Sequence, residues 1–236
     1  MARLLLIDSF NFIFRAFHAR QRTSAAPMRT SRGTSTEAIY IFHNMVRRLQ
    51  KQYQPEYLAA VYESEGPTFR DEQFAEYKAN RAETPPELIE QIPAIQRMLE
   101  AMRIPVLQSP GYEADDVIGT VARKAAAEGV EVWIVSSDKD MLQLVGGNIF
   151  MLDAMKNDTL YDPAKVKEFK GVAPEQIADL LALVGDSSDN IPGAPGIGDK
   201  GAVQLLGQFD SLEALLDRAA EVPRKAYRES LQNNRE

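Results

Sequence analysis

Three short apolar runs that each lead into an acidic residue constrain the fold of this 236-residue chain more than any other feature. They are Leu4–Asp8, Leu58–Glu63 and Val132–Asp138. Continuous apolar runs of this length are typical of strands that are buried on both faces of a parallel sheet. In open α/β sheets, ligands bind outside the carboxyl ends of the strands. We therefore expect the three terminal acids to lie at one ligand-binding edge.

Helical patterns separate these runs. Apolar residues recur at helical spacing over residues 36–52, 86–102 and 114–128. Strands that alternate with helices predict an α/β domain with right-handed crossovers, which we assign to residues 1–162. The sheet is expected to be mostly parallel.

Two stretches interrupt this alternation. Residues 20–33 are polar and basic and predict an exposed loop. Residues 66–86 mix aromatic side chains with both charges, a composition too aromatic for a simple connection. Beyond about residue 163 the strand pattern disappears, which predicts a helical subdomain over residues 163–236. Its expected helices are 164–169, 174–184, 200–207 and 211–219.

Carboxylates are the densest chemical signal. In a helix that begins near Glu113, Glu113 and Asp116 share one face, with Asp115 beside them. Acids in a first helical turn also complement the helix dipole, so each alone has a structural explanation. Three acids within four residues repel one another unless water or cations neutralise them. Nine carboxylates can converge: Asp8, Glu63, Glu113, Asp115, Asp116, Asp138, Asp140, Asp186 and Asp189.

An all-oxygen ligand set suits hard cations such as Mg²⁺ or Mn²⁺. Two such ions about 3.5–4 Å apart can activate water and stabilise the leaving oxygen of a phosphodiester. The sequence therefore predicts metal-assisted phosphodiester hydrolysis.

Other chemistries fit less well. A Ser-His-Asp triad would need His18 or His43, and no nucleophile elbow is present. An aspartyl-phosphate phosphatase would need an acid where Phe10 stands. The chain has no cysteine, which excludes thiol catalysis, disulfides and Cys-based zinc sites and agrees with a cytoplasmic setting.

A glycine-rich turn follows the acids. Gly196, Gly198 and Gly201 match G-x-G-x-x-G, but a helix precedes them rather than the strand that a dinucleotide site requires. A helix-hairpin-helix over residues 185–207 instead offers backbone N–H groups to a phosphate, with Lys200 adding charge. A plain antiparallel helix pair with a glycine-rich connection remains the structural alternative.

Together these motifs resemble the 5′ nuclease domain of bacterial DNA polymerase I, within the flap endonuclease family. The matching stretches run in family order across about residues 3 to 207. They are Leu4–Asp8 with Arg15, Gly66–Arg70, Glu76–Arg81, Gly111–Asp116, Ser137–Asp140, Gly185–Gly193 and Gly196–Lys200.

The resemblance implies a resolvase-like (PIN-like) α/β nuclease core, a helical arch over the site from residues 66–86, and a hairpin that grips duplex DNA. The nine carboxylates would hold two Mg²⁺ or Mn²⁺ ions. In the basic stretches, Arg15, Lys78 and Arg81 would contact phosphates near the scissile bond, and Tyr77 would stack on an unpaired base. Arg70 would extend the same basic wall.

The resemblance also implies a monovalent cation site. Its ligands would be the hairpin carbonyls of Pro192, Ala194 and Ile197, which would hold K⁺. Three positions depart from the family pattern: Glu63 stands for Asp, Phe10 for a small or polar residue, and Gly201 for Thr. The chain also ends before the last helices expected of such a domain, and a polymerase module in the natural gene is compatible with the resemblance.

The resulting hypothesis is a divalent-metal-dependent 5′→3′ exonuclease and structure-specific flap endonuclease acting on DNA in replication and repair. One alternative is a DNA-junction binding protein that has lost catalysis. Another is an RNase of the related toxin-type fold, against which the hairpin and arch argue.

The net charge of −7, from 34 acidic and 27 basic residues, would ordinarily argue against a nucleic-acid partner. Without the nine site carboxylates, however, 25 acidic residues face 27 basic ones. DNA binding near the site is therefore expected to be weak and strongly salt-dependent unless divalent metal is present. The apolar run before Asp8 is too short for a signal peptide or a membrane span.

Overall fold

The computed structural model describes residues 1–21 and 28–235. The chain divides into two compact units, which are described separately. Unit 1 contains residues 1–69, 82–141 and 147–160, and unit 2 contains residues 70–81, 142–146 and 161–236. The structure thus groups residues 70–81, the middle of the expected arch, with the helical unit. Residues 22–27 of the predicted 20–33 loop lie outside the described residues.

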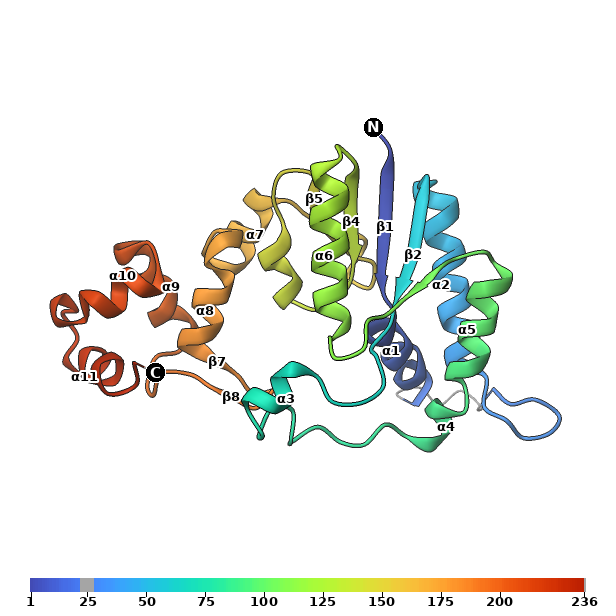
Figure 1. Ribbon diagram of the computed structural model, residues 1–236, viewed down its shortest axis with the longest axis horizontal. Helices are drawn as coiled ribbons and strands as arrows, with labels where there is room; N and C mark the ends of the chain where they lie inside the picture. The colour runs from blue at the N-terminus through green and yellow to red at the C-terminus, as the bar shows by residue number, and fades with distance from the viewer. Residues whose placement is uncertain (22–27, 236) are drawn as a thin grey trace. The chain divides into compact units, whose positions relative to one another are not determined.

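The sheet of unit 1 has six strands in the order β3-β2-β1-β4-β5-β6 (Figure 1). β1 pairs in parallel with β2 and β4, β2 pairs in parallel with β3, and β4 with β5. This mostly parallel α/β architecture confirms the predicted fold class. The strands are β1 (Arg3–Asp8), β2 (Tyr57–Val61), β3 (Val106–Leu107), β4 (Glu131–Val135), β5 (Ile149–Asp153) and β6 (Thr159–Tyr161).

Two of the predicted strands, over residues 58–63 and 132–138, end earlier in the structure than predicted. β2 ends at Val61 and β4 at Val135, so Glu63 and Asp138 lie in the loops beyond them, and only Asp8 closes its strand. At this edge the side chains of Asp8 and Ser136 are buried and bond to each other where the ladder ends. Strands β3, β5 and β6 were not predicted.

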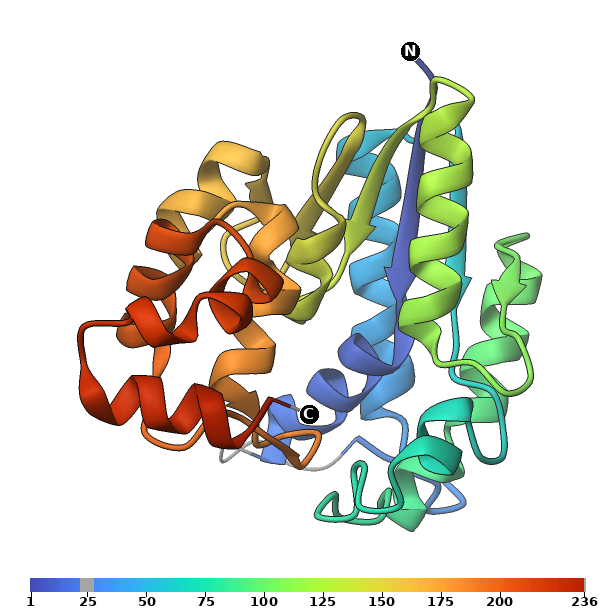
Figure 2. The same ribbon diagram turned by 60° about the vertical axis from the view of Figure 1, so that its left-hand side comes forward.

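Helices cover both faces of the sheet. The face opposite α6 is covered by α1 (Ser9–Gln21), α2 (Glu37–Tyr53), α4 (Pro86–Ile89) and α5 (Ile92–Ala101), and α6 (Ala114–Ala127) covers the other (Figures 1 and 2). Side chains alternate along a strand, so Leu5 and Ile7 pack with the aromatic residues of α1 and α2, and Leu6 points toward α6. Both faces of β1 are therefore buried, as its continuous apolar run indicates.

The predicted 86–102 helix is broken in two. Pro93 lacks a backbone N–H, and a proline ring clashes inside a continuous helix, so α5 starts afresh at Ile92. Gln91, in the break, is buried, and its Oε1 accepts the backbone N–H of Ala38 at 3.0 Å. The break thus supplies an acceptor for the start of α2, where the N–H groups have no partner within the helix.

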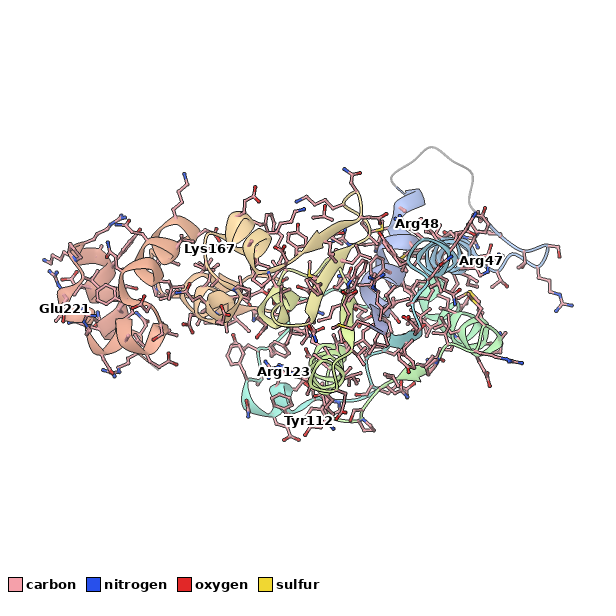
Figure 3. The ribbon with its side chains drawn as sticks, turned by 90° about the horizontal axis from the view of Figure 1, so that it is seen from above. Arg47, Arg48, Tyr112, Arg123, Lys167 and Glu221 are labelled. Atoms are coloured by element: carbon pink, nitrogen blue, oxygen red, sulfur yellow. The ribbon has the colours of Figure 1, made fainter. Side chains whose placement is uncertain are left out.

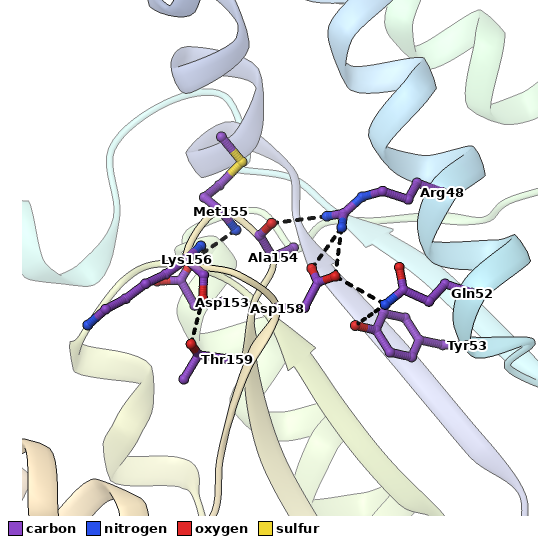
Figure 4. A network of polar contacts seen from close by, with 9 residues as sticks. All are labelled: Arg48, Gln52, Tyr53, Asp153, Ala154, Met155, Lys156, Asp158 and Thr159. Carbon is purple, nitrogen blue, oxygen red and sulfur yellow. Dashed lines mark hydrogen bonds and ion pairs between the residues drawn. The ribbon is translucent and has the colours of Figure 1, made fainter.

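A polar network ties α2 to the turn between β5 and β6. Of the neighbouring arginines on α2 in Figure 3, Arg48 donates to both carboxylate oxygens of Asp158, at 2.7 and 2.9 Å, and to Ala154 O at 3.0 Å. Gln52 adds a bond to Asp158 at 3.1 Å (Figure 4). The turn itself has left-handed backbone at Asn157 and Asp158, which these residue types tolerate.

Unit 2 is mostly helical, as expected. The structure adds a two-stranded antiparallel ribbon and a last helix that were not predicted. No helix in the described residues is long and apolar enough to cross a membrane. The elements are α3 (Phe69–Gln73), η1 (Asp140–Leu144), α7 (Pro163–Lys170), η2 (Pro174–Gln176), α8 (Ile177–Val184), β7 (Gly185–Asp186), β8 (Ile191–Pro192), α9 (Asp199–Phe209), α10 (Leu212–Asp217), η3 (Ala219–Glu221) and α11 (Lys225–Asn233).

Candidate functional site

The carboxyl ends of β1, β2 and β4 meet at one edge of the unit 1 sheet. In the register, Asp8 lies beside Val61, and Ile7 lies beside Val135. The loops that follow these three strands therefore start side by side. This edge brings together the acids predicted to follow the strands.

Asp8 is buried and held in place by two neighbours. Its Oδ2 accepts the Ser136 hydroxyl at 2.7 Å, and its Oδ1 accepts the Asn11 N–H at 3.4 Å. The same Ser136 oxygen accepts the Asp138 N–H at 3.0 Å, and Asp138 Oδ1 accepts the Asp140 N–H at 2.9 Å. One hydroxyl therefore sets the positions of two site acids.

The start of α6 brings a second group of acids to the edge. Glu63 Oε2 accepts the Ala114 N–H at 3.0 Å, and Asp116 Oδ2 accepts the Glu113 N–H at 3.1 Å. Glu113 is the buried N-cap residue of the helix. The longer side chain of Glu63 thus bridges β2 to α6, and Asp116 has the capping role that acids in a first turn often have.

Electrostatics shows that these acids share one environment. Burial, with the charges of Asp138 and Glu63, raises the pKa of Asp8 to about 6. Burial, with the charges of Asp8, Asp138, Glu63 and Glu113, raises the pKa of Asp115 to about 8. Five carboxyl groups therefore repel one another at the strand edge, and a bound cation would relieve that repulsion.

The side chains do not already form a ligand cage. Among residues 1–21 and 28–235, no three acidic or histidine side chains converge closely enough to hold a metal ion as they stand. The donor chemistry, however, is that of a hard-cation site, because every group is a carboxylate and two have raised pKa values. The predicted two-metal site stays a prediction about these residues.

The last two predicted ligands belong to unit 2. Asp186 ends β7, and Asp189 lies in the loop between β7 and β8. At the other end of this ribbon Gly185 and Gly193 lie so close that a Cβ on Gly185 would be 2.4 Å from Gly193 N. Burial opposes ionisation of Asp186, but hydrogen bonds from Ser188 outweigh it and lower its pKa. Asp186 is therefore an ionised carboxylate.

Asp189 lies at the centre of the basic segment's contacts. We call residues 70–81 the basic segment after Arg70, Lys78 and Arg81, which stand beside three acidic residues there, and residues 187–190 the ribbon loop. The Arg81 guanidinium forms an ion pair with Asp189 Oδ1, and the Tyr77 hydroxyl donates to Asp189 Oδ2 at 3.0 Å. The Lys78 ammonium lies 4.8 Å from the centre of the Tyr77 ring, which is buried. The buried ring is held on one side by this ammonium and at its hydroxyl by Asp189, and its stacking on a base stays a prediction.

The glycine hairpin leads into α9. Gly196 has a left-handed backbone (φ +81°), Gly198 is the N-cap residue, and open space surrounds both Cα atoms. Lys200 is exposed in the first turn. The first N–H groups of α9 have no acceptor within the helix, which is the feature that a helix N-terminus offers to a phosphate.

The three carbonyls predicted to hold K⁺ lie along this hairpin, at Pro192, Ala194 and Ile197. The Ala194 carbonyl accepts the Ile197 N–H at 3.0 Å, and the Ala194 N–H donates to Leu183 O at 2.9 Å. The first bond lies within the hairpin, and the second joins the hairpin to the end of α8. A carbonyl has two lone pairs, so the Ala194 oxygen retains the capacity to bind a cation.

Two departures from the family pattern have packing explanations. Phe10 packs edge-on against Tyr62, with ring centroids 5.5 Å apart, behind the acidic edge. Gly201 lets α9 approach α11, because a Cβ there would lie 2.6 Å from the Tyr227 hydroxyl oxygen. Arg15 is exposed on α1, and Arg70 is half-buried in α3.

Sequence reasoning missed three polar residues that organise the site: Ser136, Asn80 and Asn190. Ser136 directly follows β4 and so lies beside Asp8 at the strand edge, which the predicted register could have indicated. The two asparagines lie in stretches already singled out, but their partners are backbone carbonyls more than 100 residues away in sequence. No local pattern reports such contacts.

An α/β sheet with an acidic carboxyl edge, together with a helical unit carrying a glycine hairpin, defines the resolvase-like class of nuclease folds. Residues 3–171 match the N-terminal resolvase-like domain of 5′-3′ exonucleases, and residues 172–236 match their C-terminal SAM fold. The chain belongs to the 5′-3′ exonuclease family.

Several relatives show how far the similarity extends. The chain is 45% identical over its whole length to DNA polymerase I of Pseudomonas aeruginosa, of which it covers 26%. It is 41% identical over 92% of its length to a 5′-3′ exonuclease of Aquifex aeolicus, of which it covers 73%. It thus spans about a quarter of the length of the polymerase relatives it matches.

Solved structures share the fold. A T5 5′-exonuclease with bound zinc has a TM-score of 0.78 at 23% identity, with 97% of this chain and 83% of that one covered. The catalytic core of Rad2 with a DNA substrate has a TM-score of 0.58 at 17% identity, covering 100% of this chain and 73% of that one.

Proposed function

We propose that the chain is a divalent-metal-dependent nuclease that hydrolyses DNA phosphodiesters as a 5′→3′ exonuclease and flap endonuclease. The observation that carries this proposal is the group of mutually repelling carboxyls at the edge of the sheet, with the pKa of Asp115 raised to about 8. Buried like charges are unfavourable in a protein that never binds a cation, and they suit one that does.

The carboxylates would hold two Mg²⁺ or Mn²⁺ ions. Asp8, Asp115 and Asp138 are the central ligands in this proposal, because their charges act on one another at the edge of the sheet. When bound, such ions supply an activated water and stabilise the leaving oxygen. The T5 5′-exonuclease was crystallised with divalent ions, which supports the assignment. Ser136 would keep Asp8 and Asp138 oriented through its two hydrogen bonds.

DNA would be held by backbone groups and cations. The start of α9 and Lys200 would bind duplex phosphates, and the hairpin carbonyls would bind K⁺ beside them. Lys78 and Arg81, with Arg15 and Arg70, would contact phosphates near the cleaved bond, where positive charge stabilises the transition state. Arg81 would exchange its ion pair with Asp189 for a phosphate.

The test is cleavage of a labelled 5′-flap duplex with Mg²⁺ by wild type and Asp115→Asn. We choose this variant because it keeps the side-chain shape, whereas a change at Asp116 would also remove a helix cap. Wild type is expected to cleave, and Asp115→Asn to lose at least about 100-fold in rate, the scale of losing one electrostatic catalytic group. The exposed Asp217→Asn is the matched control. Absence of metal-dependent cleavage by wild type overturns the proposal.

A junction-binding protein without turnover is the second candidate function. It is favoured by one observation, that the described side chains do not already converge in a ligand arrangement. It predicts flap binding in Ca²⁺ with no cleavage in Mg²⁺ or Mn²⁺. The same assay, run beside a binding titration, separates the two functions.

A further inference from the structure

Two asparagines fasten the basic segment to the ribbon loop within unit 2. Asn190 Nδ2 donates to Glu76 O at 2.8 Å, and Asn80 Nδ2 donates to Ser187 O at 2.8 Å. Each amide reaches across to a backbone carbonyl of the other segment, so the two bonds are reciprocal. We call this pair of bonds the amide latch.

The latch encloses an unusual backbone. Between its two bonds, the Lys78 N–H donates to Asp189 O at 2.9 Å, and Lys78 has a left-handed backbone with φ +54°. Asn190 is also left-handed, with φ +59°. Asparagine tolerates this conformation, but lysine rarely adopts it, and such residues persist where the surroundings over-determine them. The two latch bonds, at Glu76 and Asn80, hold the backbone in place on both sides of Lys78.

The direction of two cationic side chains depends on this backbone. Lys78 places its ammonium over the Tyr77 ring, and Arg81, three residues on, places its guanidinium against Asp189 and near Ser188 O. The latch bonds themselves join uncharged groups. They can therefore persist when the ion pair of Arg81 is screened by salt or replaced by a phosphate.

We propose that Asn80 and Asn190 are positioning residues that fix the backbone from which Lys78 and Arg81 reach the DNA phosphates. The proposal rests on the proposed function, because the phosphate contacts of Lys78 and Arg81 belong to it. The asparagines touch neither substrate nor metal in this arrangement. They act through the backbone of the basic segment.

The variants are Asn190→Gly and Asn80→Ala, with Asn80→Gln as the conservative rescue. Glycine accepts the left-handed backbone at position 190, so Asn190→Gly removes the amide without adding strain. Asn157→Gly is the matched control, because it removes an asparagine amide from another left-handed position, in unit 1. Unfolding by urea, followed by far-ultraviolet circular dichroism, checks that every variant is folded, because the helices of unit 2 contribute to that signal and Trp133 lies in unit 1.

Three readouts are taken on the full chain: hydrogen exchange of the Lys78 amide, affinity for 5′-flap and plain duplex DNA in Ca²⁺, and the single-turnover cleavage rate in Mg²⁺. Both latch variants are expected to exchange the Lys78 amide about five- to tenfold faster, the change that follows loss of one hydrogen bond. The cleavage rate falls about tenfold and flap affinity about fivefold, whereas plain-duplex affinity stays within twofold. Asn80→Gln recovers part of each loss.

The outcomes are distinct. Unchanged amide exchange in both latch variants overturns the latch. Faster exchange with unchanged cleavage and unchanged flap affinity overturns the positioning role. If wild type cleaves no DNA, the proposed function fails, and the exchange and flap-affinity measurements still decide whether the latch positions the two cations.

Discussion

At the scale of single residues, the acids at the sheet edge make the free energy of unfolding depend on pH. Burial and mutual repulsion raise the pKa of Asp8 to about 6 and that of Asp115 to about 8, from an ordinary value of 3.8. The folded chain therefore binds protons more tightly than the unfolded chain between about pH 4 and pH 8. Because the unfolded state releases protons first, these two groups lower the free energy of unfolding as pH rises through this window.

Replacement of Asp115 by asparagine is expected to remove much of that loss. In metal-free buffer, Asp115→Asn should match wild type near pH 4 and exceed its free energy of unfolding at pH 8 by on the order of 2 kcal/mol. Saturating Mg²⁺ should narrow the gap, because wild type has one more ionised carboxyl at the edge for a bound cation to stabilise than Asp115→Asn has. Urea denaturation across this pH range measures both effects. A gap that is the same at pH 4 and pH 8, or that also appears in Asp217→Asn, contradicts the prediction.

At the scale of elements, hydrophobic periodicity predicted the strands and helices that have a clear apolar pattern in their own sequence. The strands around Leu4–Asp8 and the helix over 114–128 were predicted from their apolar patterns, and each formed within a few residues of its expected bounds. β3 was missed because a two-residue edge strand has no periodicity to detect. The 86–102 helix was drawn as one because the apolar spacing continues through Pro93, where the backbone cannot continue.

A second example at the scale of elements is the turn between β5 and β6, which is held by hydrogen bonds from α2. Arg48→Ala should lower the free energy of unfolding by about 1 kcal/mol and speed amide exchange over residues 154–158, because it removes the bonds to Asp158 and Ala154. Arg47→Ala is the matched control, since Arg47 is the next residue of α2 and is also exposed (labelled in Figure 3). Equal effects of the two variants would argue against the network.

At the scale of the whole molecule, the proposed binding of DNA depends on charge. The net charge of −7 includes the nine acids that we propose as metal ligands, and 25 acidic residues against 27 basic ones remain. Affinity for DNA should therefore depend on divalent cations more than on the overall charge, because an ion at the acidic edge removes the repulsion of phosphate.

Affinity of wild type for a flap duplex should fall at least tenfold when Ca²⁺ is replaced by EDTA at constant ionic strength, as judged by fluorescence anisotropy. Lys200→Ala should weaken binding equally across DNA sequences and reduce the slope of log affinity against log salt by about one, the value for one lost phosphate contact. Lys51→Ala, an exposed lysine of α2, should leave the slope unchanged. If Lys51→Ala reduces the salt slope and Lys200→Ala does not, the assignment of a phosphate contact to Lys200 is wrong.

The sequence by itself determined the class of fold and the residues available for chemistry. Apolar periodicity specifies strands and helices because burial is the dominant favourable term in folding, and the acids that follow the strands are written in the same segments. Tertiary structure decided what those residues do. It placed the Ser136 hydroxyl between Asp8 and Asp138, made Glu63 an acceptor for the start of α6, and joined Asp189 to Arg81. Contacts between residues 100 or more positions apart depend on packing and register, which no local pattern encodes.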